Sequence, residues 1–346
     1  MKAGVWKEKG RFAVEEVPTP HPGPGEIVMK VKYCAICGSD VHRAFVYGIL
    51  RPDIILGHEY SGTVHEVGEG VTRWKVGDRI VGGGGTPSPG AVVTSPSRTR
   101  PARYSARTVG LTAPDAALGG AYAEYILLQE WRPLPIPEGV SDVAAALTEP
   151  CATAVHATRL SGIKLGDRVG IIGIGPIGLF TMQCARAAGA SKIIVADTSP
   201  ERLEAARKLG ADVVINPRKE NTVEEMLNAT DNLGPDIVFE CAGAIVTLDQ
   251  ALTAVKREGR VIYVALSWEP TPTLPVEWVG REIEMKCVYA HYPYEWEMAL
   301  DLMASGKIKV DSLMVRPSDY FPLDNIQQAF EKCVDPNDQL QVVIVP

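Results

Sequence analysis

The chain has 346 residues, 46% of them hydrophobic and 22% charged, and a formal net charge of −7. This length predicts a globular protein of two domains. The negative charge argues against a protein that binds nucleic acids or anionic membranes. No window holds the roughly 20 apolar residues of a membrane-spanning helix, and no signal-peptide pattern opens the sequence. The seven cysteines are scattered, so we expect a cytoplasmic protein without a disulfide framework.

Residues 1–152 are predicted to form a first domain, an all-β barrel. Short segments with period-two alternation lie between turns rich in glycine and proline. We expect strands at residues 26–33, 61–68, 78–81 and 121–128.

The stretch 82–120 breaks this pattern. It opens with four glycines, carries Arg98, Arg100, Arg103 and Arg107, and has no acidic residue before Asp115. Such a long excursion is usually functional or mobile. We weigh three interpretations: a lobe over the surface or at a subunit contact, a basic flap that holds an anionic substrate tail, and disorder.

From residue 153 onward, short apolar strands alternate with helices, which predicts a parallel sheet covered on both faces. Strands are expected at 168–172, 192–196, 212–215, 236–240 and 260–264, and helices at 176–188 and from Pro200 to Leu209. We assign 153–290 to this doubly wound Rossmann domain. Residues 291–346, with helices at 295–305 and 323–333 and a strand at 339–345, are expected to return to the first domain.

Cys37, His58 and Glu59 form a candidate metal site. A thiolate, an imidazole and a carboxylate suit Zn²⁺ better than magnesium or calcium, which prefer oxygen ligands alone. Three protein ligands leave a fourth position for water or substrate, which is the catalytic arrangement. Glu149, at the junction of the two domains, is a further candidate that completes or alternates in the zinc shell, and Cys151 is its rival.

Cys34 and Cys37 also form a C-x-x-C pair, which occurs in redox motifs and structural zinc sites. The sequence has no second C-x-x-C, so we interpret Cys34 as a small buried residue on a strand. The remaining cysteines lack ligand-like spacing and are expected to be inert thiols.

Gly173, Gly175, Pro176, Ile177 and Gly178 form a G-x-G-x-x-G turn between a predicted strand and a predicted helix. In that context the glycines allow a tight turn, a close approach to a pyrophosphate and close packing of helix on strand. The phosphates would meet the N-terminus of the helix.

Asp197 ends the next strand, 19 residues after Gly178. A carboxylate there can bind both ribose hydroxyls and repels a 2′-phosphate, which favours NAD over NADP. Two roles are open for Arg202. Its guanidinium could stack on the adenine, or it could weaken the discrimination against NADP.

The sequence resembles the zinc-dependent medium-chain alcohol dehydrogenases, in the branch of the sorbitol, butanediol and threonine dehydrogenases. The similarity runs nearly end to end and is carried by the segments 37–42 (CGSDVH), 57–62 (GHEYSG), 76–79 (VGDR), 147–150 (LTEP), 173–178 (GIGPIG) and 301–308 (DLMASGKI). The resemblance implies a GroES-like catalytic barrel and a Rossmann coenzyme domain. It also implies that Cys37, His58 and Glu149 surround the zinc, with Glu59 a ligand in some states.

The chain departs from this family in one respect. Many members carry four closely spaced cysteines that hold a structural zinc, whereas no cysteine lies between Cys37 and Cys151 here. We therefore expect one zinc per subunit. The resemblance also implies a homodimer or homotetramer, joined through the edge of the Rossmann sheet near residues 286–289.

Three side chains beside the zinc ligands suggest a proton path during oxidation of an alcohol. Ser39 is placed to take the alcohol proton, and His42 to carry it to solvent through the cofactor ribose, since histidine is the common proton carrier near neutral pH. Asp40 is a candidate to orient His58.

Phe45, Tyr47, Tyr122 and Trp268 are predicted to line a fairly apolar substrate pocket. Such a pocket favours a secondary alcohol, a diol or a cyclic alcohol, and the matching ketone, over a sugar. Threonine or polyol oxidation, an anionic alcohol of the acyl-CoA type and, remotely, a non-catalytic nucleotide-binding protein are the alternatives.

Overall fold

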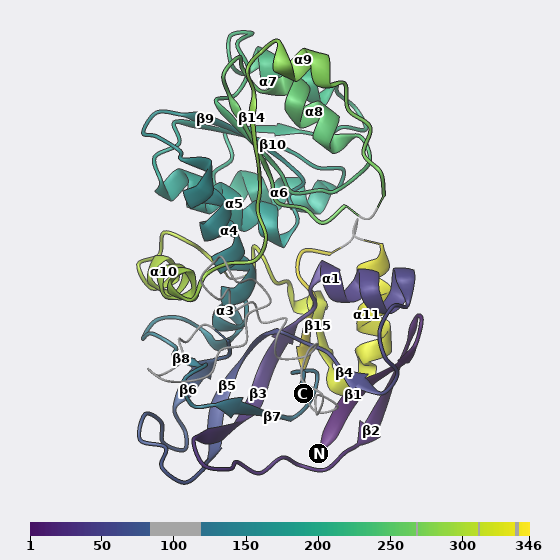
Figure 1. Ribbon diagram of the computed structural model, residues 1–346, viewed down its shortest axis with the longest axis vertical. Helices are drawn as coiled ribbons and strands as arrows, with labels where there is room; N and C mark the ends of the chain where they lie inside the picture. The colour runs from purple at the N-terminus through teal and green to yellow at the C-terminus, as the bar shows by residue number, and fades with distance from the viewer. Residues whose placement is uncertain (84–118, 268, 311, 336–338) are drawn as a thin grey trace.

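The computed structural model describes residues 1–83, 119–267, 269–310, 312–335 and 339–346. Two lobes stack along the long axis, and helices α3 (Asp142–Ala146) and α4 (Thr148–Ser161) run between them (Figure 1). The lower lobe holds both chain termini. Most of the predicted excursion at 82–120, and Trp268, lie outside the described residues.

The lower lobe is built mainly from antiparallel strands, as the alternating sequence predicts. Its larger sheet has the order β15-β16-β3-β5-β6-β8, with β7 also paired to β3, and the smaller sheet has the order β2-β1-β4. The strands are β1 (Lys2–Glu8), β2 (Arg11–Glu16), β3 (Glu26–Ala35), β4 (Ile54–Ile55), β5 (Glu59–Val67), β6 (Arg79–Val81), β7 (Tyr125–Gln129), β8 (Leu134–Pro135), β15 (Tyr320–Pro322) and β16 (Val343–Val345). Because β15 and β16 join this sheet, the C-terminal segment returns to the first lobe.

Short helices close this lobe. Helix α1 (Gly38–Val41) runs into the π-helical turn η1 (His42–Tyr47), and α11 (Ile326–Val334) packs against β2. The aromatic ring of Phe330 on α11 stacks on that of Phe12, with ring centroids 4.2 Å apart. Two 3₁₀ turns, η3 (Pro317–Asp319) and η4 (Leu323–Asn325), connect the last elements.

The upper lobe is a six-stranded parallel sheet with the order β11-β10-β9-β12-β13-β14. Its strands are β9 (Arg168–Ile172), β10 (Lys192–Ala196), β11 (Val213–Ile215), β12 (Ile237–Glu240), β13 (Arg260–Tyr263) and β14 (Glu284–Cys287). The helices are α5 (Pro176–Ala187), α6 (Pro200–Lys208), α7 (Thr222–Asn228), α8 (Thr247–Ala254), α9 (Pro275–Val279) and α10 (Pro293–Ala304). The central strands are buried, as their continuous apolar runs predict.

The predicted strands and helices of the upper lobe match this sheet to within one or two residues at their ends. Ser199 caps α6 by accepting a hydrogen bond from the backbone N–H of Arg202, and Pro200 takes the first helical position. The strand predicted at 121–128 begins only at Tyr125, and the final strand predicted at 339–345 is limited to β16.

Helix α4 runs across residue 152, where the sequence placed the end of the first domain. The domain limits at 152 and 290 therefore stay a prediction. Helix α10 packs against α4, and Glu295 of α10 accepts hydrogen bonds from His156 and Arg159 in this buried contact. Among the described residues, no helix is long and apolar enough to cross a membrane.

Candidate active site

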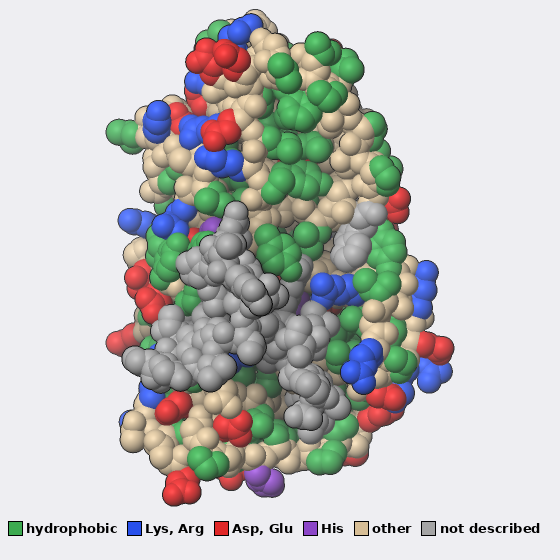
Figure 2. Space-filling model, in the orientation of Figure 1, with side chains coloured by type: hydrophobic (Ala, Val, Ile, Leu, Met, Phe, Trp, Pro, Cys, Tyr) green, Lys and Arg blue, Asp and Glu red, His purple; other side chains and the backbone are tan. Residues whose placement is uncertain are grey.

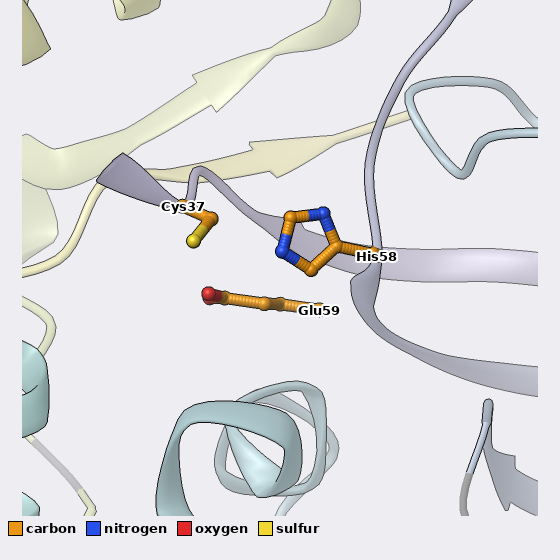
Figure 3. A group of neighbouring side chains, drawn as sticks. All are labelled: Cys37, His58 and Glu59. Carbon is orange, nitrogen blue, oxygen red and sulfur yellow. The ribbon is translucent and has the colours of Figure 1, made fainter. Parts of the chain in front are cut away.

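Cys37, His58 and Glu59 come together where β3 ends and β5 begins (Figure 3). Their ligand atoms all lie within 4.8 Å of one another. One ring nitrogen of His58 faces the Cys37 sulfur and the Glu59 carboxylate. Antiparallel pairing of Ala35 with Glu59 holds these two strand ends together, so residues about 20 positions apart in sequence become neighbours.

The electrostatics of this group fit a divalent cation. Burial, followed by the carboxylates of Asp40 and Glu149, raises the pKa of the Cys37 thiol to about 11. Burial and the nearby Cys37 and Glu149 also raise the pKa of Glu59. The buried Oε2 atom of Glu59 has no hydrogen-bond partner in the structure. A sulfur, an imidazole and a carboxylate around one point match the donor set of catalytic zinc.

Asp40, the residue predicted to orient His58, lies next to its ring. Its Oδ2 atom lies 3.4 Å from Nδ1 of His58 and accepts a hydrogen bond of 2.9 Å from the Tyr122 hydroxyl. Contact at Nδ1 leaves Nε2 as the nitrogen for a metal. Gly57, just before His58, has φ of +106°, and a Cβ there would meet the Cys34 sulfur and the Tyr122 amide at 2.8 Å. Glycine is therefore required to seat the histidine.

Glu149 also reaches this site, from the first turn of α4. Its rival Cys151 is fully buried in the apolar core and forms a hydrogen bond with Cys184. Cys34 likewise lies fully buried in the core of the lower lobe. Among the described residues, Glu149 lines the cleft beside the candidate metal group, and neither of these cysteines does.

The metal group opens into a cleft between the lobes with a volume of about 530 Å³. Gly175, Pro176 and Ile177 of the glycine turn line the same cleft. A Cβ at Gly173 or Gly178 would collide with backbone at 2.5 Å or less, whereas one at Gly175 would meet only Arg202 at 3.5 Å. Gly175 therefore keeps open a cradle at the start of α5, where a dinucleotide pyrophosphate fits.

Asp197 and Arg202 lie beside this turn. Asp197 accepts hydrogen bonds from the backbone N–H groups of Ile174 and Ser199, at 2.7 and 2.8 Å. Arg202 lines the cleft, donates to the Gln339 carbonyl and lies 4.0 Å from Asp197. Asp197 is not itself among the described residues that line the cleft, so it contacts the site through its neighbours.

Ser39 and His42 both line the cleft next to Cys37. The Ser39 hydroxyl donates to the Cys37 sulfur at 3.2 Å. Nδ1 of His42 lies 2.8 Å from the Gly38 carbonyl oxygen, which can only accept, so this nitrogen carries the proton of the neutral ring. The opposite nitrogen, Nε2, is then the one that can accept a proton.

The described members of the predicted substrate wall, Phe45, Tyr47 and Tyr122, do not line this cleft. Tyr122 is fully buried and donates to Asp40, and Phe45 packs against Phe12 and Phe330. Tyr47 donates to Glu269 at 3.4 Å and is not among the described residues that line the cleft. Trp268 lies outside the described residues. Phe45 and Tyr47 both lie on the π-helical turn η1, which directs the Phe45 ring to the lobe core and Tyr47 toward Glu269.

The cleft instead uses residues that the sequence did not single out. Small and apolar side chains line it near the metal group and the glycine turn: Ile36, Val46, Leu266, Val288 and Ala290. His291 is fully buried beside Glu149, with 3.4 Å between Nε2 and Oε1. No sequence motif surrounds His291, so its position beside Glu149 can be recognised only in the folded structure.

Comparisons with known proteins agree with this geometry. Residues 176–305 match the family model of zinc-binding dehydrogenases, and residues 23–138 match that of the GroES-like domain of alcohol dehydrogenases. Sorbitol dehydrogenase of Bacillus subtilis is 32% identical, with 100% of this chain and 97% of that protein covered. (R,R)-Butanediol dehydrogenase of the same organism is 32% identical, and both chains are fully covered.

A solved structure shares the fold as well. A protein described as a zinc-binding dehydrogenase, from Sinorhizobium meliloti and bound to NADP, superposes with a TM-score of 0.84 at 30% identity, covering 100% of this chain and 99% of that one. The chain belongs to the zinc-dependent medium-chain alcohol dehydrogenases. It is an enzyme that uses zinc and a nicotinamide cofactor on an alcohol, which sets aside the non-catalytic interpretation.

Proposed function

We propose that this enzyme transfers a hydride between NAD and a secondary alcohol, vicinal diol or cyclic alcohol, giving the ketone. The observation that carries the proposal is the shared cleft: the Cys37, His58 and Glu59 group and the glycine turn open into one cavity. Small and apolar side chains such as Ile36, Val46 and Ala290 contribute to the lining of this cavity. An alcohol bound there can lie close to both groups.

Cys37, His58, Glu59 and Glu149 would hold the zinc, and the glycine turn would hold the dinucleotide. When bound, zinc supplies a Lewis acid that lowers the pKa of a hydroxyl group, and the nicotinamide supplies the hydride acceptor. The protein's own task is to orient the alcohol and to remove its proton. Asp40 fixes the tautomer of His58, and the apolar cleft walls limit competing water.

Ser39 and His42 are the proposed proton carriers. The Ser39 hydroxyl lies at the thiol of Cys37, where the alcohol proton would be released. The Ser39 hydroxyl would then pass a proton to Nε2 of His42. The other nitrogen of this ring, Nδ1, donates a hydrogen bond to the Gly38 carbonyl oxygen. General acid–base groups of this kind contribute about 10²- to 10⁴-fold to a rate.

We therefore expect Ser39→Ala to lower kcat by about 10²-fold while KM changes little, because the proton path is lost and binding is not. Zinc content and melting temperature should match the parent enzyme. Steady-state kinetics with elemental analysis would check this. Full turnover by a zinc-loaded Ser39→Ala enzyme would rule out the relay.

The substrate class follows from the cleft wall near the metal group. Val46, Leu266 and Val288 offer no hydrogen-bonding side-chain atoms to a chain of hydroxyl groups. A hydroxyl group placed against these three side chains would lose hydration without compensation, whereas the apolar end of a short secondary alcohol would not. The sorbitol dehydrogenase relative is the observation that favours the alternative, a polyol. Threonine also remains an alternative, while the arginines proposed to hold an anionic substrate lie outside the described residues.

A panel of secondary alcohols, vicinal diols, cyclic alcohols, sorbitol and threonine, each with NAD and with NADP, tests the proposal. We expect a kcat/KM at least about tenfold higher for a short diol or secondary alcohol than for sorbitol, since one lost buried hydrogen bond costs about 1–3 kcal/mol. A preference for sorbitol or threonine would overturn the substrate class and leave the enzyme class intact.

We also propose a homodimer or homotetramer joined at strand β14. This strand is the edge of the parallel sheet, and hydrophobic side chains gather over α8, α9 and β14 (Figure 2). Val276 and Val279 are each 70% exposed there. Exposed apolar patches beside an unpaired edge are typical of subunit contacts. A monomer by light scattering would contradict this proposal.

A further inference from the structure

We propose that His291, held by Trp296, is a positioning residue that orients the Glu149 carboxylate at the metal group. This inference rests on the proposed role of Glu149 beside the zinc. Neither His291 nor Trp296 is among the described residues that line the cleft, so both act from behind it.

The hydrogen bonds fix which nitrogen of His291 carries the proton. The Trp296 indole N–H lies 2.8 Å from Nδ1 of His291 and 3.3 Å from Nε2, so Nδ1 is the nearer acceptor. An indole N–H can only donate, and a neutral imidazole has one donor and one acceptor nitrogen. Nε2 of His291 is therefore the N–H donor, and it lies 3.4 Å from Oε1 of Glu149.

Both residues are built into the core. His291 and Trp296 are fully buried, and their rings meet edge to face with centroids 5.3 Å apart. Trp296 lies on α10, which packs against α4, the helix whose first turn carries Glu149. The indole therefore ties the orientation of the histidine to the helix pair that also places the carboxylate.

The backbone before His291 supports a functional role. Ala290 has φ of +56°, a left-handed conformation that non-glycine residues rarely adopt. Strained residues of this kind cluster at functional sites. Here the turn lets Val288, Tyr289 and Ala290 line the cleft while the next side chain, His291, points into the core beside Glu149. Four consecutive residues thus contact the cleft or the carboxylate.

The test measures release of zinc from the loaded enzyme to a colorimetric chelator, a readout that needs no substrate. His291→Leu removes the donor and should speed release by about 10- to 100-fold, the usual effect of losing a hydrogen bond behind a metal ligand. His291→Gln presents an amide N–H near the position of Nε2 and should stay within about threefold of the parent, as a conservative replacement of the donor. His65→Leu, an exposed histidine on β5, serves as a matched control and should have no effect.

The double variant separates this inference from the proposed site. Glu149→Ala should itself speed zinc release, and adding His291→Leu should then change nothing, because the two residues act as one unit. If Glu149→Ala releases zinc at the parent rate, the proposed metal shell fails. If Glu149→Ala has its effect but His291→Leu has none, or His291→Gln is as damaging as His291→Leu, the positioning role fails.

Discussion

Replacing Cys37 with serine should abolish zinc binding and lower kcat/KM by at least about 10³-fold, since a bound metal contributes several kcal/mol to the transition state. A neutral serine hydroxyl is a poor substitute for a soft thiolate ligand. The fold should survive, because Cys37 also caps α1 by accepting from the Ser39 amide, and serine is a good N-cap. Elemental analysis, circular dichroism and kinetics would measure the three outcomes.

The parent enzyme should contain one zinc per chain. Cys287→Ser is the matched control, because Cys287 is an exposed cysteine that belongs neither to the metal group nor to the described cleft lining. It should keep both the zinc and the activity. Two metals per parent chain, or a Cys37→Ser enzyme that retains its zinc, would contradict the assignment of this site.

The sequence predicted the metal group and the glycine turn because their chemistry is local. Cys37, His58 and Glu59 lie within 23 residues, and a single strand pairing brings them together. The glycine turn is determined by the strand before it and the helix after it. At Gly57 and Gly173 a side chain would collide with neighbouring atoms, so only glycine fits. Short segments with such steric requirements can be recognised from the sequence.

The cleft walls were not predictable in the same way. Phe45 follows the 37–42 segment closely in sequence and Tyr122 does not, but the rings of both pack into the lower lobe core. Tyr122 contributes by holding Asp40, which no pattern indicates. His291 lies 142 residues from Glu149, and only the packing of α10 on α4 unites them. Contacts of such long sequence separation depend on tertiary structure, which periodicity does not encode.

The second large effect is expected at Asp197, where Asp197→Ala should reverse the preference between the two cofactors. Hydrogen bonds to a charged group are worth about 1.5–3 kcal/mol, so if Asp197 binds the ribose as proposed, its loss should lower kcat/KM for NAD by about 10- to 100-fold. Removing the negative charge also removes the repulsion of a 2′-phosphate, so kcat/KM for NADP should rise. Kinetics with both cofactors would give the ratio directly.

Two controls make this prediction specific. Asp197 also accepts from the Ile174 amide, so Asp197→Asn, which keeps a carbonyl oxygen, tests loss of charge with the glycine turn still held. Asp212→Asn alters a half-exposed carboxylate that pairs with Arg186 outside the described cleft lining, and the cofactor ratio should not change. An Asp197→Asn enzyme with the parent ratio would show that this carboxylate only shapes the turn.

Arg202 should decide how far the preference moves. Its guanidinium lies 4.0 Å from Asp197. Burial lowers the pKa of Arg202, and the negative charge of Asp197 opposes this shift. Once Asp197 is neutral, the guanidinium is placed to bind a 2′-phosphate, and arginine forms strong bidentate pairs with phosphate. Adding Arg202→Ala to Asp197→Ala should therefore cancel the gain with NADP. If the gain in kcat/KM for NADP persists in the double variant, then the choice of cofactor is set by repulsion from Asp197 alone and not by attraction to Arg202.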